Sequence, residues 1–417
     1  MTISDLVGRP PTQLFVWIWM PDAADPVLCG RLDEGRPITF TYARAYRERE
    51  NAVAVYSPEL ALDADRAWGP LDGDRLPLCI DDSMPDSWGR RLVNHRLGAG
   101  FADLSELTYL LASGSDRFGA LDFQQSSTEY LTRNTDLPTL DDLAEAAHRI
   151  ERGEPLHARL LEALLHGTSI GGARPKALLR HSESSVIAKF SSSTDTYPVV
   201  QGEYVAMSLA RRCGLDVAGV SLVRAHNRPA LLVERFDRPN QGDAWRGRRR
   251  VVSALTVMGL NTFPGGRYAT YDGLADQIRR SFAEPDATLR ELFGRISFNI
   301  LCGNIDDHGR NHAAFVDERG LQLTPAYDIC PQARAGTNAN QAMAYSREGQ
   351  RVSRLRPLVE AAFVYHLDTT ESQAIVDAQV QEIRDSWDDV CDEGELTSEQ
   401  RSTFFGGQFL NPFAFET

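Results

Sequence analysis

The stretch FNILCGNIDDHGRNHAAFVDERGLQLTPAYDI, residues 298–329, contains the residues around which we expect the chain to be organised. Within it, Asp306 and Asn311 are separated by four residues. A protein-kinase catalytic loop carries its base and its metal-binding amide at this D-x-x-x-x-N spacing. An apolar helix over 288–303 should be buried and should hold the loop rigidly at its C-terminal end. The spacing favours a phosphotransfer centre, although an Asp-rich turn after a helix is by itself most often a solvated loop.

A second acid follows a predicted hairpin. The short apolar runs 313–316 and 321–323 are joined by the turn-forming sequence DERG, and Asp328 lies just beyond the second run. In kinases this later acid chelates Mg²⁺ over the ATP phosphates. Carboxylate and amide oxygens suit a hard cation such as Mg²⁺, whereas no Cys and His residues have zinc-like spacing. The pattern therefore indicates a magnesium site that includes Asn311 and Asp328.

The composition is that of a folded globular protein. The chain has 417 residues, of which 42% are apolar and 24% charged, so it is long enough for two or more domains with substantial cores. Its formal net charge of −14 argues against broad electrostatic attraction to nucleic acid. The one basic run, RGRRR at 246–250, is interpreted as a solvated loop in preference to a phosphate-binding patch.

The cysteines and the N-terminus predict a cytoplasmic protein. The six cysteines form no C-x-x-C pair, and the N-terminus lacks the basic start and apolar core of a signal peptide. No apolar run approaches the roughly 20 residues needed to cross a bilayer, so no membrane partner is expected. Cys302 and Cys330 flank the suspected site, but their apolar neighbours predict buried fillers rather than nucleophiles.

The N-terminal part is predicted to be rich in strands and the following part to be mostly helical. QLFVWIWM (13–20) is a dense aromatic and β-branched run typical of a buried strand, and 27–43 predicts two more strands joined by a turn. Apolar residues at helical spacing then predict helices over 103–113, 139–153 and 156–167.

Directly after the last of these helices stands TSIGGARPKALL, residues 168–179. Two adjacent glycines, Gly171 and Gly172, followed by Lys176 can bring backbone N–H groups and an ammonium against phosphate oxygens. The motif matches neither the GxxxxGK[ST] of a P-loop nor the GxGxxG of ordinary protein kinases, and by itself it is equally consistent with a plain turn. Ser169 is in reach of a transferable phosphate if the loop folds inward, and otherwise it caps a turn.

The next segments follow the order of a kinase N-lobe. SVIAKF (185–190) predicts a strand that carries Lys189, and a helix over 201–214 and two further strands come after it. In kinases a strand lysine in this order contacts the α- and β-phosphates, although a lysine on an edge strand is common in any protein. VERFDRP (233–239) lies where a kinase chain crosses between its lobes, so its backbone groups could hydrogen-bond an adenine.

Taken together, these pieces resemble the HipA family, the serine/threonine-kinase toxins of bacterial HipA/HipB toxin–antitoxin pairs. The resemblance covers nearly the whole chain and rests on DDSMPDSWGRR, SIGGARPKALL, VERFDRP, NIDDHGRNHAAF and PAYDICP. It implies an α+β, kinase-like (HipA) fold with an N-terminal β-rich subdomain and a mainly α-helical C-terminal region. We expect the β-rich subdomain over 1–110, the phosphate loop and N-lobe-like region over 111–240, and the helical C-lobe-like region with the catalytic loop and metal site over 241–417.

The resemblance also implies a role for each matched residue. Asp306 would be the catalytic base, Asn311 and Asp328 the Mg²⁺ ligands, and Lys189 the phosphate-binding lysine. Asp307 stands where some family members have a small residue, so it is open whether this second acid shares the role of Asp306; the spacing favours Asp306. The implied nucleotide-binding residues are Gly171, Gly172, Ala173, Lys176, Lys189, Glu234, Phe236, His308, Asn311, Tyr327 and Asp328.

A regulatory site and two partners are implied as well. Ser169 would be the autophosphorylation site, whose modification expels the mobile loop and silences the kinase. A phosphoserine adds nearly two negative charges beside the acidic centre, so the loop should no longer fold inward. ATP and Mg²⁺ would be the cofactors, and the substrate would be a translation-linked protein, notably an aminoacyl-tRNA synthetase. A small HipB-like helix-turn-helix antitoxin would hold the kinase in check, and the acidic chain would reach DNA only through it.

Two other classes of function are consistent with parts of the pattern. The first is a nucleotide-binding pseudokinase that acts as a transcriptional co-regulator with a DNA-binding antitoxin, and the intact Asp306, Asn311 and Asp328 argue against it. The second is a metal-dependent phosphohydrolase. Such sites usually hold two metals through several His and Asp ligands, and only His308 and His312 lie near.

Overall fold

A computed structural model shows the chain as two compact units. The first contains residues 1–193, 225–228 and 234–252, and the second contains 194–224, 229–233 and 253–417. The described residues are 9–63, 65–70, 74–98, 104–132, 139–157, 160–161, 164, 174–181, 184–238, 247–262, 264–333 and 338–416. The three-part division expected from the sequence stays a prediction.

The first unit contains a five-stranded antiparallel sheet with the strand order β4-β3-β2-β1-β5. β1 lies between two neighbours, and Leu14, Val16 and Ile18 on it are fully buried, which confirms the buried strand predicted over 13–20. Large aromatic and β-branched side chains favour this inner position because they pack against both adjacent strands. The bounds are β1 (Gln13–Ile18), β2 (Val27–Asp33), β3 (Thr39–Tyr42), β4 (Ala67–Trp68) and β5 (Leu121–Gln124).

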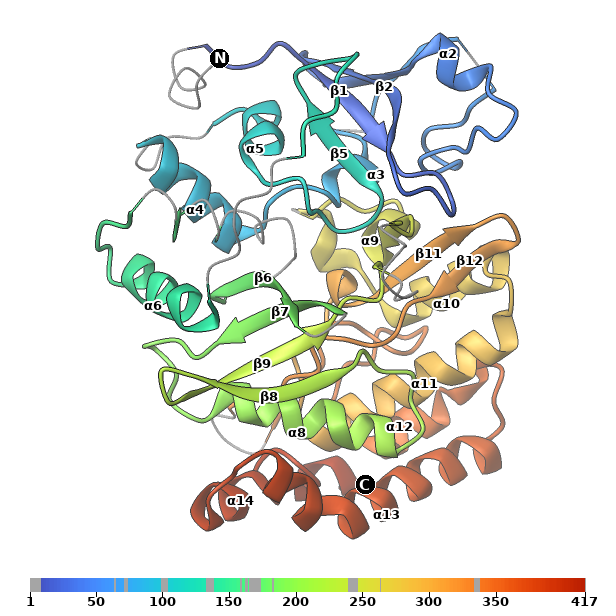
Figure 1. The fold of residues 1–417 in the computed structure, drawn as a ribbon. Coiled ribbons are helices and arrows are strands. Elements are labelled where there is room, and N and C mark those ends of the chain that lie inside the picture. The colour runs from blue at the N-terminus through green and yellow to red at the C-terminus, as the bar shows by residue number, and fades with distance from the viewer. Residues whose placement is uncertain are drawn as a thin grey trace. The chain divides into compact units, whose positions relative to one another are not determined.

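Short helices and a hairpin complete the first unit (Figure 1). Capping explains where the helices begin: the Asp86 carboxylate accepts a hydrogen bond from the backbone N–H of Gly89 at 2.6 Å, and Thr139 and Asp142 form a capping box. Two predicted helices are confirmed, whereas much of the one predicted over 156–167 lies outside the described residues. The bounds are α2 (Arg44–Arg47), α3 (Leu78–Asp81), α4 (Ser87–Leu97), α5 (Glu106–Ala112), α6 (Leu140–Glu151), β6 (Lys176–His181) and β7 (Ser184–Phe190).

The second unit is mainly helical, and α8 and α11 both pack against the long helix α13 (Figure 1). Helix α11 begins at Pro285 and is buried at every position from Leu292 to Cys302, which confirms the buried helix predicted before the catalytic loop. The bounds in this unit are α8 (Val199–Arg212), α9 (Ala254–Val257), η1 (Gly265–Tyr268), α10 (Tyr271–Ser281), α11 (Pro285–Cys302), η2 (Gly309–Asn311), β11 (Ala313–Asp317), β12 (Gly320–Leu323), α12 (Leu355–Glu360), η3 (Ala362–Tyr365), α13 (Thr369–Glu393), α14 (Ser398–Phe404) and η4 (Pro412–Phe415). Three strands have residues assigned to each unit: β8 (Val220–Ala225), β9 (Arg228–Glu234) and β10 (Val251–Ser253).

Two predictions about the chemistry of the chain can be compared with these elements. Cys302 and Cys330 are both buried, as predicted for fillers. Among the described helices, none combines the length and the apolar character that a membrane span requires.

Gly303 ends α11 and provides the first stability prediction. Its φ is +74°, and a Cβ there would lie 3.0 Å from the backbone oxygen of Gln408. Gly349 has a similar φ of +79° but no atom within 4 Å of such a Cβ. We expect Gly349→Ala to lower the free energy of unfolding by about 1–2 kcal/mol through backbone strain alone, and Gly303→Ala to lower it further because the backbone at Gln408 must shift. Thermal and denaturant unfolding of both variants measures the difference, and equal losses would contradict the contact.

Candidate active site

The loop between α11 and η2 presents Asp306, and backbone hydrogen bonds fix it on both sides. The N–H of Ala342 donates to the carbonyl of Ile305 at 3.1 Å, and the N–H of Asn311 donates to the carbonyl of His308 at 2.8 Å. The Asn311 side chain is buried, and its Nδ2 lies 3.5 Å from the carbonyl oxygen of Asp306. The predicted acid and amide are therefore brought together on one short loop, on the second unit.

Asp307, the neighbouring acid, is turned into the protein. Its side chain is buried, and one oxygen, Oδ2, accepts hydrogen bonds from the Tyr271 hydroxyl, from Asn299 Nδ2 at 2.8 Å and from His312 Nε2 at 2.7 Å. Burial alone would raise the pKa of Asp307, but the His312 ring and the Tyr271 hydroxyl lower it below its ordinary value. Asp307 is therefore an ionised structural residue that links α10, α11 and His312, the residue directly before β11.

Asp306 has the opposite environment. Its side chain is exposed, so a substrate hydroxyl can approach it. Partial loss of hydration raises its pKa above the ordinary value; the carboxylates of Asp328 and Asp307 add to this rise, and His308 opposes it. Of the two adjacent acids, only Asp306 has a side chain that is exposed to a bound molecule, and its role as the base stays a prediction.

Asp328 is held beside this loop by the segment that precedes it. The Ala326 N–H donates to the carbonyl of Asp216 at 2.7 Å, and the Tyr327 hydroxyl donates to the carbonyl of Arg310 at 2.8 Å. Asp328 itself has a φ of +59°, a left-handed conformation that is uncommon for non-glycine residues and that Asp adopts more readily than most of them. Such positions cluster at functional sites, and this one places a half-buried carboxylate where it acts electrostatically on Asp306.

The donor atoms at this loop fit a magnesium ion. Asn311 and Asp328 offer an amide oxygen and a carboxylate, and the mutual repulsion of Asp306 and Asp328 would be relieved by a cation. Across the described residues, no three or more His, Cys, Asp and Glu side chains form a group that could hold a metal. The set is therefore suited to a cation that takes its remaining ligands from phosphate and water, as Mg²⁺ does.

The two predicted phosphate-binding lysines of the first unit are cross-strand partners. Lys176 on β6 lies directly opposite Lys189 on β7. Two like charges in such a position destabilise a hairpin, but the ammonium of Lys176 is buried and its Nζ lies 2.8 Å from Asp86 Oδ2. The Lys176 carbonyl also accepts a hydrogen bond from Trp88 Nε1 at 3.3 Å. Lys176 is thus anchored at the start of a strand, and its role toward phosphate stays a prediction, as does that of half-buried Lys189.

The other predicted residues of the first unit divide into two groups. Glu234 ends β9 and is exposed, and the ring of Phe236 contacts that of Phe118 edge to face with 5.9 Å between centroids. Their role in binding a base stays a prediction. The predicted loop residues Ser169, Gly171, Gly172 and Ala173 lie outside the described residues.

The basic run at 246–250 is not a solvated loop over its described part, so that interpretation was wrong. The Arg248 guanidinium stacks 3.4 Å above the ring of Trp19 and donates to the carbonyl of Ser115 at 2.8 Å. Arg250 donates to the carbonyl of Ala54 at 2.7 Å. Planar guanidinium groups form such stacked and carbonyl-bound contacts readily, and composition alone does not distinguish them from solvated arginines.

Comparison with known proteins identifies both halves of the chain. The model of the HipA N-terminal domain matches residues 24–124, and the model of the HipA-like C-terminal domain matches residues 168–391. A putative kinase named Y4mE from Sinorhizobium fredii is 27% identical over 318 residues, which cover 71% of this chain and 73% of that protein. The serine/threonine-protein kinase toxin HipA of Shewanella oneidensis is 27% identical over 289 residues, which cover 62% of this chain and 65% of that protein, less than two thirds of its length.

The fold is also similar to a solved structure. The HipA chain of the Shewanella oneidensis HipA, HipB and operator DNA complex superposes with a TM-score of 0.68, covering 97% of this chain and 100% of that one at 19% identity. This similarity confirms the predicted α+β, kinase-like fold with its β-rich N-terminal part and mainly helical C-terminal part.

Proposed function

Since this chain belongs to the HipA family of serine/threonine-kinase toxins, we propose that it transfers the γ-phosphoryl group of ATP to a serine or threonine hydroxyl of a protein. The observation that supports this reaction best is the division between two adjacent acids. Asp307 is buried and bound by three donors, whereas Asp306 is exposed and has a raised pKa beside the Asp328 carboxylate. A general base must be accessible to its substrate, as the exposed Asp306 is.

Asp306 would orient the substrate hydroxyl and take its proton. The hydroxyl oxygen forms a bond to the γ-phosphorus, the bond from that phosphorus to the bridging oxygen breaks, ADP leaves, and the hydroxyl proton passes to Asp306. A raised pKa makes this carboxylate a stronger base. Asn311 and Asp328 would hold Mg²⁺, which when bound neutralises charge on the phosphate oxygens.

The remaining roles follow the same assignment. Lys189 would contact phosphate, with Lys176 at the end of the phosphate loop, and the backbone of Glu234 and Phe236 would contact the base. His308 and Tyr327 would border the nucleotide from the catalytic loop and from the segment before Asp328. Each of these is a proposal for that residue.

We also propose a physiological setting. The substrate would be a translation-linked protein such as an aminoacyl-tRNA synthetase, and the reaction would take place in the cytoplasm. A HipB-like antitoxin is proposed as the partner because the Shewanella protein of the same fold was solved with HipB and operator DNA. The net charge of −14 supports indirect rather than direct contact with DNA.

The experiment that tests the activity is intact-mass analysis and peptide mapping after incubation with Mg²⁺ and ATP. We expect one phosphate on Ser169 in the native chain and none in Asp328→Ala, because the variant lacks the carboxylate that would hold the metal. Asp317→Ala is the matched control, since it removes an exposed acid at the end of β11 and should retain the phosphate. ATP binding with no phosphate anywhere would favour the pseudokinase, and free phosphate without labelled protein would favour a phosphohydrolase.

A further inference from the structure

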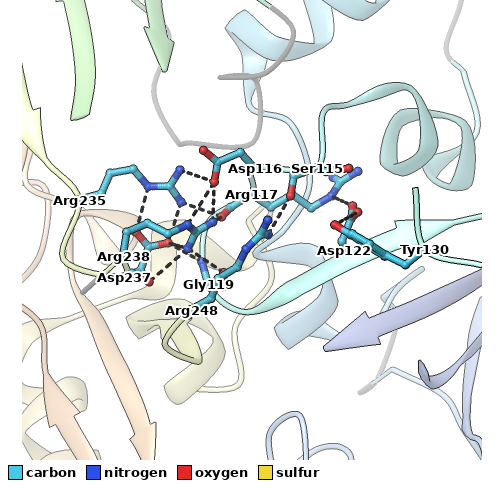
Figure 2. A network of polar contacts seen from close by, with 10 residues as sticks. All are labelled: Ser115, Asp116, Arg117, Gly119, Asp122, Tyr130, Arg235, Asp237, Arg238 and Arg248. Atoms are coloured by element: carbon cyan, nitrogen blue, oxygen red, sulfur yellow. Dashed lines mark hydrogen bonds and ion pairs between the residues drawn. The ribbon is translucent and has the colours of Figure 1, made fainter. Parts of the chain in front are cut away.

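A partly buried network of arginines and aspartates surrounds the segment that follows β9 (Figure 2). It joins two similar sequences, DRFG at 116–119 and ERFDR at 234–238. The Asp237 side chain is buried, as is that of Arg235. We name the set formed by Asp116, Arg235, Asp237 and Arg238 the arginine–aspartate cluster.

Asp237 is the centre of this cluster. Arg235 forms a bidentate ion pair with it, with Nε 3.0 Å from Oδ1 and Nη2 2.8 Å from Oδ2. Arg238 Nη1 approaches Oδ2 at 2.9 Å, and the backbone N–H of Gly119 donates to the same oxygen at 2.8 Å. A bidentate ion pair fixes the relative orientation of the guanidinium and the carboxylate as well as their distance, because the two planar groups must be coplanar.

The arginines extend the cluster to the 116–119 turn. Arg235 Nη1 lies 2.9 Å from Asp116 Oδ1, and Arg235 Nη2 donates to the carbonyl of Arg117 at 2.7 Å. Arg238 Nη2 lies 2.7 Å from the same Asp116 oxygen, and its Nη1 donates to the carbonyl of Gly119 at 3.1 Å. The charges of the arginines outweigh burial and keep the pKa values of Asp116 and Asp237 below their ordinary range, so both acids stay ionised.

The cluster acts on the segment proposed to bind the base. Arg235 stands between Glu234 and Phe236, and its side chain is directed into the cluster while Glu234 is exposed. The Arg235 backbone N–H donates to the carbonyl of Ser185 at 2.9 Å. Main-chain recognition of a base requires peptide groups held within about half an ångström. The chain leaves β9 in a turn at 236–237, across which the Arg238 N–H donates to the carbonyl of Arg235 at 3.4 Å. Anchoring the side chains of Arg235 and Asp237 on either side of Phe236 therefore orients the peptide groups between them.

We propose that Arg235 and Asp237 are positioning residues that hold the peptide groups of Glu234 and Phe236 for the base of a purine nucleotide. This inference rests on the proposed function and specifies how one part of the nucleotide is recognised. The turn that anchors them lies in the matched N-terminal domain, residues 24–124, whereas the anchored segment lies in the matched C-terminal domain. Selectivity for the base thus depends on the N-terminal domain.

Binding of two probes to the full chain separates this role from simple stability. ATP presents a base and a triphosphate, whereas inorganic tripolyphosphate presents only the phosphates. We expect Asp237→Asn to weaken ATP binding about tenfold and to leave tripolyphosphate binding unchanged. The amide keeps the volume of the side chain but cannot form the bidentate ion pair with Arg235. Arg238→Gln, at a less buried position, should cause a smaller loss in the same direction.

Asp122→Asn is the matched control. Asp122 is equally buried and accepts from Arg117 Nε at 3.1 Å and from Gln124 Nε2 at 2.7 Å. Figure 2 shows Asp122 and Tyr130 at the opposite end of the network from Arg235 and Asp237. Unchanged ATP affinity in Asp237→Asn, an equal loss for both probes, or the same loss in Asp122→Asn would overturn the inference while leaving the proposed kinase intact. Failure of the native chain to bind ATP would overturn both.

Discussion

Asp306→Asn is expected to lower the rate of phosphotransfer by about 10²–10⁴-fold, the usual contribution of a general base. The amide keeps the shape of the side chain but cannot take a proton from the substrate hydroxyl. ATP affinity should remain close to that of the native chain, because the proposed nucleotide contacts are made by other residues. Transfer of radioactive phosphate to protein measures the first effect, and nucleotide titration measures the second.

The same variant should be more stable than the native chain at neutral pH. The pKa of Asp306 is raised in the folded protein, so its contribution to stability is full below the ordinary Asp pKa of about 3.9 and is lost as the pH rises through the raised value. The neutral Asn side chain avoids the desolvation cost of a charged group and is not repelled by the Asp328 carboxylate. Asp317→Asn, at an exposed end of β11, serves as the control for both measurements. Retained turnover, or a loss of ATP binding as large as the loss of rate, would refute the assignment of the base.

Asp307→Ala is expected to lower the free energy of unfolding by about 3–5 kcal/mol, because each buried donor that is left without its acceptor costs about 1–3 kcal/mol. The substitution leaves the Tyr271 hydroxyl, Asn299 Nδ2 and His312 Nε2 buried without their common acceptor. His312 Nδ1 already has no hydrogen-bond partner within the described parts of the chain, so Nε2 is the ring atom that holds this histidine in place. Denaturant unfolding monitored by fluorescence measures the loss.

The pH dependence gives this prediction a distinct sign. Because the pKa of Asp307 is lowered in the folded protein, its stabilisation is present above the ordinary pKa of about 3.9 and disappears as the pH falls through the lowered value. The stability difference between the native chain and Asp307→Ala should therefore shrink in acid. We therefore expect substitutions at these two adjacent positions to have opposite effects, with a gain in stability at 306 and a loss at 307. Equal effects of the two substitutions would contradict the division of roles.

Much of the fold could be predicted because its signals are local. The run at 13–20 has the composition of an inner strand, and the apolar helix 288–303 corresponds to α11 because a helix buried on all sides has few polar positions. The acid and amide of the catalytic loop were also recognisable, because their spacing of five positions is set by the loop itself. Asp306 and Asn311 lie close together because they are on the same short loop, and this requires no contacts from distant parts of the sequence.

Other parts of the site depend on partners far away in the sequence. Lys176 was predicted as a loop residue that reaches phosphate, but it begins β6 and pairs with Asp86, ninety positions earlier. The basic run at 246–250 was misjudged because its arginines contact Trp19, Ala54 and Ser115, which no local pattern connects to it. The cluster around Asp237 had one signal, the repeated alternation of charged residues and Phe in DRFG and ERFDR.

The sequence by itself predicted the kind of chemistry: the types and spacing of Asp306, Asn311 and Asp328 indicate phosphotransfer with a hard cation, since ligand type and local spacing are properties of the chain. Only the tertiary structure distinguished Asp306 from Asp307, because it exposes the first side chain and buries the second. Adjacent acids are identical in composition, and their difference arises from which one is withdrawn from water and bound by Tyr271, Asn299 and His312. Burial and hydrogen bonding set the pKa and the accessibility of a carboxylate, and both depend on residues that meet only when the chain is folded.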